Sequence, residues 1–141
     1  MSSVAMNKAV VRRLFDEVFT AGEVAAVEEI VAAEYVGYDP PNTPTAMHGV
    51  AAMKRVAERM AHAFTDRRYI VNELIAEGDL VAARVTLAAT HTGPLRGTAA
   101  TGRSVEITGT VTYRLAGGKI VASWGNWDNL GLLRQLGLPP Q

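Results

Sequence analysis

Cysteine is absent from this chain of 141 residues. A disulfide framework and a thiolate metal site are therefore excluded, and the sequence has no need of an oxidising compartment. Long apolar runs are missing too: no stretch approaches the roughly 20 residues that span a bilayer, and the first residues lack the apolar core of a signal peptide. These absences predict a cytoplasmic protein that is neither secreted nor bound to a membrane.

An excess of charge of either sign is also missing, since 14 Lys and Arg residues balance 14 Asp and Glu residues. The basic residues are scattered in pairs such as Arg12-Arg13 and Arg67-Arg68. Nucleic acid is not an expected partner, because that binding relies on a concentrated basic face. A near-neutral chain that is 48% hydrophobic has little charge to keep its copies apart. We therefore expect self-association.

The length fits one domain, which can bury roughly two thirds of the surface that the unfolded chain exposes. No repeat, linker or low-complexity segment interrupts the sequence. We predict a single domain over residues 1–141.

Three helices are predicted in the first half of the chain, from apolar residues spaced three and four apart. They cover about Asn7 to Thr20, Val24 to near Glu34, and Gly49 to Phe64. Between the second and third helices, Tyr38 to Pro44 holds three prolines in seven residues and is predicted to form a fixed loop.

The second half changes to segments rich in β-branched and aromatic residues, separated by Gly-containing turns. This pattern predicts an antiparallel meander of four strands, followed by an apolar tail of leucines. The strands are Tyr69 to Ala76, Leu80 to His91, Ser104 to Leu115 and Lys119 to Trp127.

Helices first and sheet second indicate an α+β fold, with three N-terminal helices packed on a strongly curved antiparallel sheet that forms a cone around an apolar pocket. In the third strand Val105, Ile107, Gly109, Val111 and Tyr113 share one face, which we expect to meet the helices. Thr108, Thr110 and Thr112 lie on the other face. That face either joins two subunits of a homodimer or faces solvent.

Several short segments together resemble the SnoaL-like polyketide cyclases. The resemblance covers nearly the whole chain, and it implies the cone-shaped fold shared with ketosteroid isomerase and nuclear transport factors. The segments are Val11-Arg12-Arg13-Leu14-Phe15, Tyr38-Asp39-Pro40, Glu77-Gly78-Asp79, Thr90-His91-Thr92-Gly93, Thr101-Gly102-Arg103, Gly118-Lys119-Ile120 and Arg134-Gln135-Leu136-Gly137.

The resemblance also implies an activity: characterised cyclases of the family close a carbocyclic ring by an intramolecular aldol step, without a metal or organic cofactor. Their general acid and base is an aspartate on the last strand, helped by a histidine on the preceding strand. Aligning the shared motifs places Gly125 at the aspartate and Val111 near the histidine. Neither residue can move a proton, so the family mechanism does not carry over intact. Some family members assist ring hydroxylation instead.

The remaining candidates for acid/base chemistry are Asp128, His91 and the loop pair Tyr38 and Asp39. Asp128 is either a pocket carboxylate or the N-cap of the leucine-rich tail. His91 either points into the pocket or hydrogen-bonds within the following loop, and it needs the smallest pKa shift to act near neutrality. Asp39 caps a turn in the simplest interpretation. We predict Asp128 and His91 as the catalytic pair.

Six further residues are predicted to bind the substrate. Tyr38 and Asn126 would donate hydrogen bonds to a carbonyl oxygen or its enolate, and Trp124 would stack on a planar ligand. Tyr113, Met53 and Phe15 would supply apolar wall, although such residues are more often core. The three histidines lack metal-binding spacing, so no metal site is predicted.

The sequence therefore predicts a SnoaL-like small-molecule enzyme. It would perform cofactor-free acid/base chemistry, such as cyclisation, isomerisation, hydration or assistance to hydroxylation, on an apolar and aromatic polyketide-like carbonyl compound. The alternative is a non-catalytic, dimeric ligand-binding or interaction domain of the same fold. The enzyme predicts a titrating group in the pocket, whereas the alternative predicts ligand affinity without turnover.

Overall fold

The computed structural model describes residues 3–40 and 46–140. The chain begins with α1 (Val4–Arg13), which continues as a π-helical stretch, η1 (Leu14–Thr20). The Ser3 hydroxyl caps α1 by accepting a hydrogen bond from the Met6 amide at 3.0 Å. The predicted apolar stripe is buried, including Val11, Leu14, Phe15, Val18 and Phe19.

The second predicted helix is shorter than expected. It consists of η2 (Val24–Ala26) and α2 (Val27–Ile30), and the chain then enters strand β1 (Val31–Tyr38). The prediction that the helix reaches Glu34 was therefore wrong. Valines and tyrosines fit a pleated sheet well, and β1 finds its partner strand about 90 residues away in the sequence. Local periodicity carries no information about such a partner.

Most of the remaining elements match the predicted ranges, but strand β2 (Met47–His48) was not predicted. It leads into α3 (Gly49–Ala63). The meander follows as β3 (Phe64–Glu77), β4 (Leu80–His91), β5 (Ser104–Ala116) and β6 (Lys119–Trp127), and the leucine-rich tail forms α4 (Asn129–Leu136). Strand β3 begins at Phe64 rather than at the predicted Tyr69.

The six strands form one sheet in the order β2-β1-β6-β5-β4-β3. The meander from β3 to β6 is antiparallel, as predicted, and β1 adds to it by pairing with β6 in parallel. The sheet is therefore mixed rather than wholly antiparallel. A parallel pair needs a long crossover between its strands, and the helix α3 with three strands of the meander supplies that connection.

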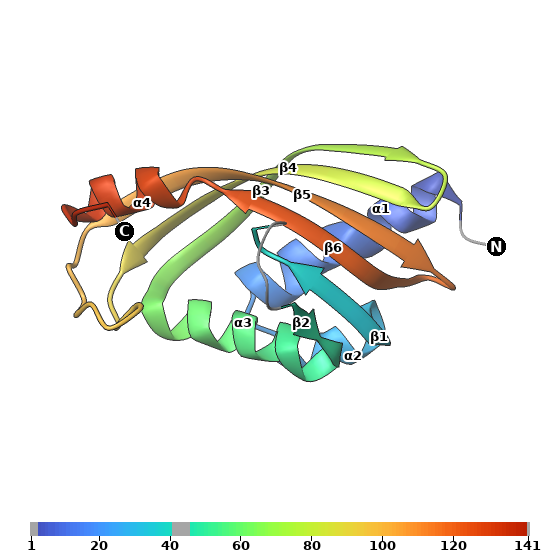
Figure 1. Ribbon diagram of the computed structural model, residues 1–141, viewed down its shortest axis with the longest axis horizontal. Coiled ribbons are helices and arrows are strands. Elements are labelled where there is room, and N and C mark those ends of the chain that lie inside the picture. Colours follow the sequence, from blue (N-terminus) through green and yellow to red (C-terminus); the bar gives the residue numbers. More distant parts are fainter. Residues whose placement is uncertain (1–2, 41–45, 141) are drawn as a thin grey trace.

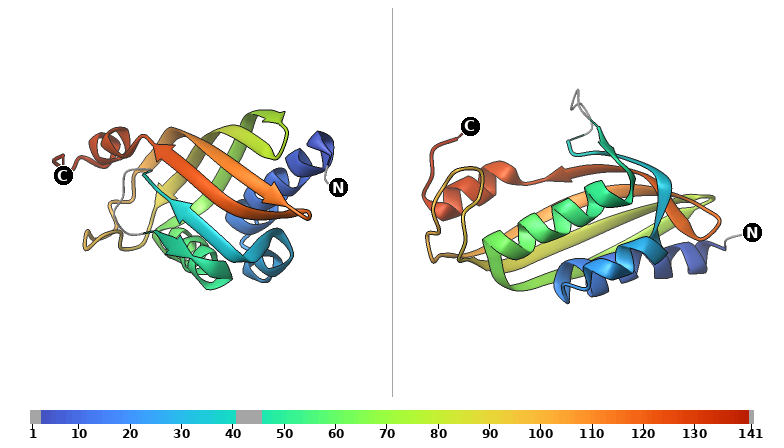
Figure 2. Two further views of the ribbon diagram at one scale, coloured as in Figure 1. Left: turned by 45° about the vertical axis from the view of Figure 1, so that its right-hand side comes forward. Right: turned by 90° about the horizontal axis from the view of Figure 1, so that it is seen from below.

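The helices α1, α2 and α3 cover one face of the curved sheet, whereas α4 extends beyond the end of β6 (Figures 1 and 2). We call the helix-covered face the inner face and the opposite one the outer face. The inner face carries alternating buried residues, as the strand periodicity predicts. On β4 and β5 these include Val81, Ala83, Val85, Leu87, Ala89, Val105, Ile107, Val111, Tyr113 and Leu115.

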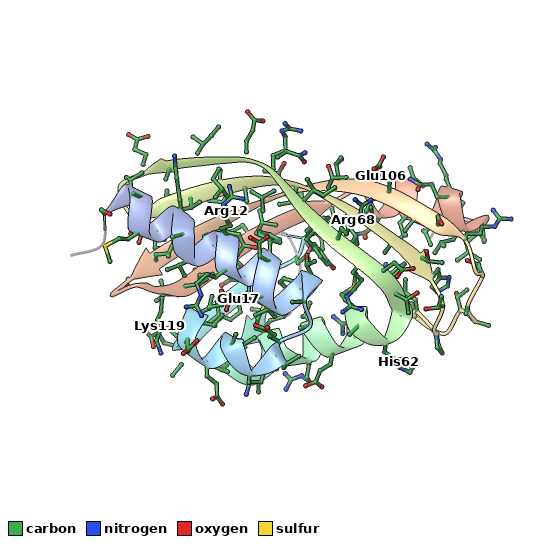
Figure 3. All side chains as sticks on the ribbon, turned by 180° about the vertical axis from the view of Figure 1, so that it is seen from behind. Arg12, Glu17, His62, Arg68, Glu106 and Lys119 are labelled. Carbon is green, nitrogen blue, oxygen red and sulfur yellow. The ribbon has the colours of Figure 1, made fainter. Side chains whose placement is uncertain are left out.

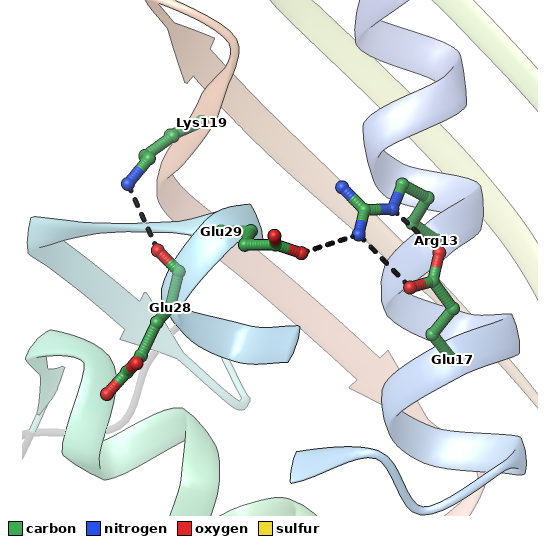
Figure 4. A network of polar contacts seen from close by, with 5 residues as sticks. All are labelled: Arg13, Glu17, Glu28, Glu29 and Lys119. Carbon is green, nitrogen blue, oxygen red and sulfur yellow. Dashed lines mark hydrogen bonds and ion pairs between the residues drawn. The ribbon is translucent and has the colours of Figure 1, made fainter. Parts of the chain in front are cut away.

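A polar network ties the helical layer together at its edge (Figure 4). Arg13 bonds Glu17 on η1 at 2.6 Å and Glu29 on α2 at 2.9 Å, while the Lys119 ammonium donates to the Glu28 carbonyl at 3.0 Å. Exposed pairs of this kind add little stability, so the network mainly fixes geometry.

Figure 3, seen from behind, shows Glu17 on the helical layer and Glu106 toward the α4 end of the sheet.

No helix within residues 3–40 and 46–140 is long and apolar enough to cross a membrane.

Candidate functional site

Four polar side chains meet on the inner face where β1, β6 and β5 lie side by side. Tyr35 belongs to β1, Asp39 follows it directly, and Ser123 and Tyr113 are cross-strand partners on β6 and β5. Because side chains alternate between the faces of a sheet, this pairing places them together on the helix-covered side. The structure thus gathers acid, hydroxyl and phenol groups that are up to 88 residues apart in the sequence.

Tyr35 and Ser123 form a buried pair, with 2.6 Å between their hydroxyl oxygens. Ser123 is only 6% exposed. The Tyr35 ring reaches this position by crossing Gly37, where any side chain would overlap the phenol oxygen. Burial raises the pKa of Tyr35, the hydrogen bond to Ser123 lowers it, and the nearby Asp39 carboxylate raises it further. Tyr35 therefore stays a neutral phenol.

The Asp39 carboxyl lies over Gly125. A Cβ atom at Gly125 would be 3.4 Å from the Asp39 Cγ and 3.5 and 3.6 Å from its two carboxyl oxygens. The β1–β6 register explains this approach: Gly37 pairs with Ser123 and Tyr38 with Trp124, so the next step along both strands brings Asp39 beside Gly125. The Asp39 carboxyl, which directly follows β1, thereby occupies the space above Gly125 of β6.

The surroundings of Asp39 favour the neutral carboxylic acid. Desolvation raises the pKa of Asp39, and the positive charges of Arg96 and Arg59 partly oppose that effect. Asp39 is exposed as a whole residue, because it stands at the open edge after β1, but its carboxyl is turned toward the buried Gly125. No described residue forms a hydrogen bond or ion pair with this carboxyl.

Two more phenols extend the site along the inner face. Tyr113 is 3% exposed, and burial raises its pKa well above the usual range, with Tyr35, Asp39 and Tyr69 adding to the effect. Burial likewise raises the pKa of Tyr69. Neither hydroxyl is hydrogen-bonded within the described part of the chain. The Trp127 ring covers Gly109 and meets Tyr69 edge-on, with 6.1 Å between ring centroids.

Three of the predicted ligand-binding residues, Tyr38, Trp124 and Asn126, lie on the outer face. Tyr38 stacks on Trp124 at 6.3 Å, and Trp124 also lies beneath the Arg114 guanidinium at 5.5 Å. A register shift between β5 and β6 near Val121 sets this phase. It turns Ser123 and Gly125 inward and Trp124 and Asn126 outward, so these residues face away from Asp39.

His91 lies inside the molecule, as its strand parity predicts, with 0% exposure. It is the last residue of β4, packs against Phe64 and turns toward α4. The Thr101 amide donates to its Nδ1 at 3.2 Å, so the neutral ring carries its proton on Nε2. That Nε2 is buried and has no partner among the described residues. The hydrogen bond to the following loop is therefore present, whereas a place for His91 in a ligand pocket stays a prediction.

Asp128 caps α4. Its Oδ1 accepts a hydrogen bond from the Gly131 amide at 2.8 Å, which is the N-cap interpretation of this residue. Asp128 is exposed, and no hydrogen bond or ion pair joins it to His91 in the described structure. The structure therefore does not bring the predicted catalytic pair into contact, and the catalytic role of the two residues stays a prediction.

Phe15 and Met53 are buried in the core. The Phe15 ring packs on Tyr69 and Tyr113, with centroids 6.1 Å apart in both cases. Val111 is the cross-strand partner of Gly125. Phe15 thus lies next to Tyr113, and Val111 lies next to Gly125.

Neither of two hollows in the described part of the chain is the predicted apolar pocket. One encloses about 10 Å³, roughly the space of a water molecule, between His91, Arg96 and leucines of α4. The other is an open acidic surface beside η1 and α2. The ligand-sized apolar pocket stays a prediction. Within residues 3–40 and 46–140, no three His, Asp or Glu side chains are grouped to hold a metal ion.

The sequence offered Asp39 as a candidate with turn capping as its simplest role, and neither Tyr35 nor Ser123 was predicted. One signal was present: Tyr35, Gly37 and Asp39 alternate in the manner of strand residues sharing a face. The segment was interpreted as helix and loop, so this alternation went unused. The pairing with β6, which gives the three residues their neighbours, depends on tertiary structure.

Solved structures similar to this chain include TsrD from Streptomyces laurentii, with 24% identity, a TM-score of 0.88 and 99% of this chain and 100% of that one covered. AclR from Streptomyces galilaeus, provisionally assigned as a hydroxylase, shares 28% identity at a TM-score of 0.84, with 98% and 100% covered. IdmH from Streptomyces antibioticus, provisionally assigned as a polyketide cyclase, shares 28% identity at a TM-score of 0.79, with 94% and 99% covered. No curated protein matches in sequence.

The fold and the inner-face site define a cone-shaped α+β domain whose polar groups are held against a helical layer. The family model of the SnoaL-like polyketide cyclases matches residues 9–136. The chain therefore belongs to the SnoaL-like polyketide cyclase family.

Proposed function

We propose that this protein is a cytoplasmic small-molecule enzyme that moves protons on an apolar, aromatic or polyketide-like carbonyl compound, without a metal ion or organic cofactor. The observation that carries the proposal is the Asp39 carboxyl, which has a raised pKa and no ion-pair partner among the described residues. Buried phenols stand nearby. A desolvated carboxyl beside hydrogen-bond donors is the arrangement that acid/base chemistry on a carbonyl requires.

The family and its relatives support this class of chemistry. Cyclisation and isomerisation of a carbonyl compound share one demanding step, the removal of a proton from the carbon beside the carbonyl. The provisional assignments of IdmH as a cyclase and AclR as a hydroxylase suggest that the outcome after this step varies within the family. For this chain we propose cyclisation, isomerisation, hydration or assistance to hydroxylation, with family roles lost at Gly125 and Val111.

The alternative is a non-catalytic ligand-binding domain, and one observation favours it. The inner face is closely filled: the Trp127 ring lies on Gly109, and Phe15 packs against both Tyr69 and Tyr113. A filled inner face leaves a substrate little room unless side chains move. The two functions differ in turnover, which can be measured without knowing the natural substrate.

Proton exchange provides that measurement. The probe is 2-tetralone, an aromatic bicyclic ketone, dissolved in D₂O, and proton NMR follows the loss of signal from the carbon beside the carbonyl. We expect exchange to accelerate in proportion to protein concentration and to slow at acidic pH, where the catalytic base is protonated. Buffer with heat-unfolded protein is the control.

A rise in melting temperature on adding 2-tetralone, without faster exchange, would favour the ligand-binding alternative. Neither binding nor exchange with this ketone and larger fused-ring ketones would exclude the proposed function.

A further inference from the structure

The Asp39 carboxyl is placed by the fold rather than by its own loop. It follows β1 at the point where the parallel β1–β6 ladder reaches Trp124, and it continues the inner-face series of Tyr35 and Gly37. An inward carboxyl at this position stands above β6 next to Gly125. Asp39 directly follows Tyr38, the last paired residue of β1, so the sheet fixes the backbone on one side of it.

Gly125 provides the space for that carboxyl. It is buried, and a Cβ atom there would be 3.4 Å from the Asp39 Cγ, which is the limit of ordinary contact. Any longer side chain at position 125 would displace the carboxyl. Conversely, a carboxyl attached at position 125 would arrive close to the place that the Asp39 carboxyl occupies. Two strands thus offer alternative attachment points for one acid group.

The surroundings suit a group that exchanges protons. Arg59 and Arg96 act on Asp39 only through space, and neither forms an ion pair with it in the described structure. A direct arginine pair would hold the carboxylate permanently charged and weaken it as a base. On the other side, Tyr113 is 3% exposed and its hydroxyl forms no hydrogen bond with the described residues, while Tyr35 is held by Ser123.

We propose that Asp39 is the catalytic carboxylate of this protein and that Gly125 is the residue that clears its place. This inference rests on the proposed function and names the group that performs it. The site takes a ketone or diketone whose carbonyl oxygen accepts a hydrogen bond from the Tyr113 hydroxyl, while the adjacent C–H faces the Asp39 carboxylate.

The proton transfers balance without a further reactant. Asp39 takes a proton from the carbon beside the carbonyl, and the electron pair of that C–H bond moves to the carbonyl oxygen as an enolate. The enolate carbon then either bonds to a second carbonyl carbon of the same molecule or regains a proton at another position. In the first case Asp39 returns its proton to the new alkoxide, and in the second to carbon.

The other acid/base groups are less suited to this role. One carboxyl oxygen of Asp128 accepts the N-cap hydrogen bond of α4, and the residue is exposed to solvent. His91 lies at the α4 end of β4, where its Nδ1 already accepts the Thr101 amide. Variants at both positions are included, so that the pair predicted from the sequence is tested against Asp39 in one experiment.

The test measures exchange of 2-tetralone protons in D₂O by Asp39→Asn, Asp16→Asn, His91→Ala and Asp128→Asn. Asparagine keeps the size of the side chain and removes its basicity. We expect Asp39→Asn to lower the exchange rate about 100-fold or more, the typical contribution of a positioned acid or base. Asp16→Asn, the same change at an exposed carboxyl of η1, is the matched control and should stay within about threefold of the parent at matched folded fractions. A loss of about 100-fold in His91→Ala or Asp128→Asn, with Asp39→Asn unaffected, would overturn this inference.

A relocation variant makes the test specific to the site. Asp39→Ser combined with Gly125→Asp moves the carboxyl from β1 to β6, and we expect it to exchange at least about tenfold faster than Asp39→Ser alone. Gly125→Asp in the parental background should be slower than the parent, because two carboxyls then compete for one space.

The outcomes separate this inference from the proposed function. If the parent exchanges protons and Asp39→Asn does so equally well, Asp39 is not the base and only this inference is overturned. If the parent exchanges nothing, the proposed function falls and the inference with it. If Asp39→Asn loses binding of 2-tetralone together with exchange, measured as a lost rise in melting temperature, Asp39 holds the ligand and the catalytic assignment is wrong.

Discussion

Two glycines on the inner face are each covered by a side chain from another position of the sequence. Gly37 is crossed by Tyr35, and Gly125 is covered by the Asp39 carboxyl, so both glycines mark a close approach of a side chain from elsewhere. Neither has a positive φ, and the absence of a side chain is what matters. Glycine in a buried strand lowers stability, because it has no side chain to pack. Its presence at positions 37 and 125 indicates that another side chain fills the space above it.

The ionisation of Asp39 should be visible in the pH dependence of stability. Its pKa is raised in the folded state, so the folded protein binds this proton more tightly than the unfolded chain. The carboxyl therefore costs no stability below its ordinary pKa of about 3.9, and the cost grows as the pH rises through the folded-state value. Asp39→Asn should unfold at a higher urea concentration than the parent at pH 7.

Urea unfolding of the parent and Asp39→Asn at a series of pH values measures this difference. It should shrink as the pH is lowered and vanish below about pH 4. Exposed carboxylates such as Glu17 and Glu28, whose pKa values are lowered by Arg13 and Lys54, are common to both proteins and cancel. A variant less stable than the parent at pH 7 would instead mean that Arg96 and Arg59 stabilise the charged carboxylate.

At the scale of elements, the helix α4 depends on its ends. Asp128 caps its first turn, and Gly137 closes it in the left-handed conformation with φ of 75°. The side chain of Gln135 bonds both the amide and the carbonyl of Glu106, at 2.8 and 2.9 Å, and so joins α4 to β5. Leu132 and Leu136 of this helix are buried. The predicted apolar tail is therefore a docked helix.

Substitutions at Asp128 distinguish a cap from a catalytic acid. Asparagine is as good an N-cap as aspartate, so Asp128→Asn should leave the free energy of unfolding nearly unchanged, while Asp128→Ala should lower it by about 1 kcal/mol. Urea unfolding measures both variants. Should Asp128→Asn keep its stability and yet slow 2-tetralone exchange about 100-fold, the sequence-based prediction of a catalytic Asp128 would be right.

On the scale of the whole molecule, the helices leave the outer face of the sheet uncovered within the described structure (Figure 2). Thr108 and Thr110 are exposed there, and Tyr38, Trp124 and Arg114 form a stacked cluster beside them. The zero formal charge of the chain offers little repulsion between copies. This combination favours the homodimer predicted from the sequence, with two outer faces in contact.

Light scattering tests that assembly. We expect a dimer at tens of micromolar protein, and Thr110→Arg should shift it to a monomer because two arginines would meet near the symmetry axis of the interface. Ala25→Arg, an equal change on the exposed surface of η2, is the matched control and should remain dimeric. A parental monomer at this concentration would remove the prediction, and a dimer unaffected by Thr110→Arg would place the interface elsewhere.

The sequence by itself determined the elements whose signals are local. The hydrophobic stripe of the first helix, the limits of β4 and β6, and the burial of His91 follow from periods of 3.6 and 2, which a chain carries regardless of its partners. The N-cap at Asp128 could also be predicted from the sequence, because the amide that it binds, that of Gly131, lies only three residues away. Only the tertiary structure decided that Val31–Tyr38 is a strand, because its partner β6 lies far along the chain. It also decided which residues of β6 face inward, through a register shift, and it brought Asp39 over Gly125. A contact between strands so distant in sequence depends on pairing and register, which no local pattern encodes.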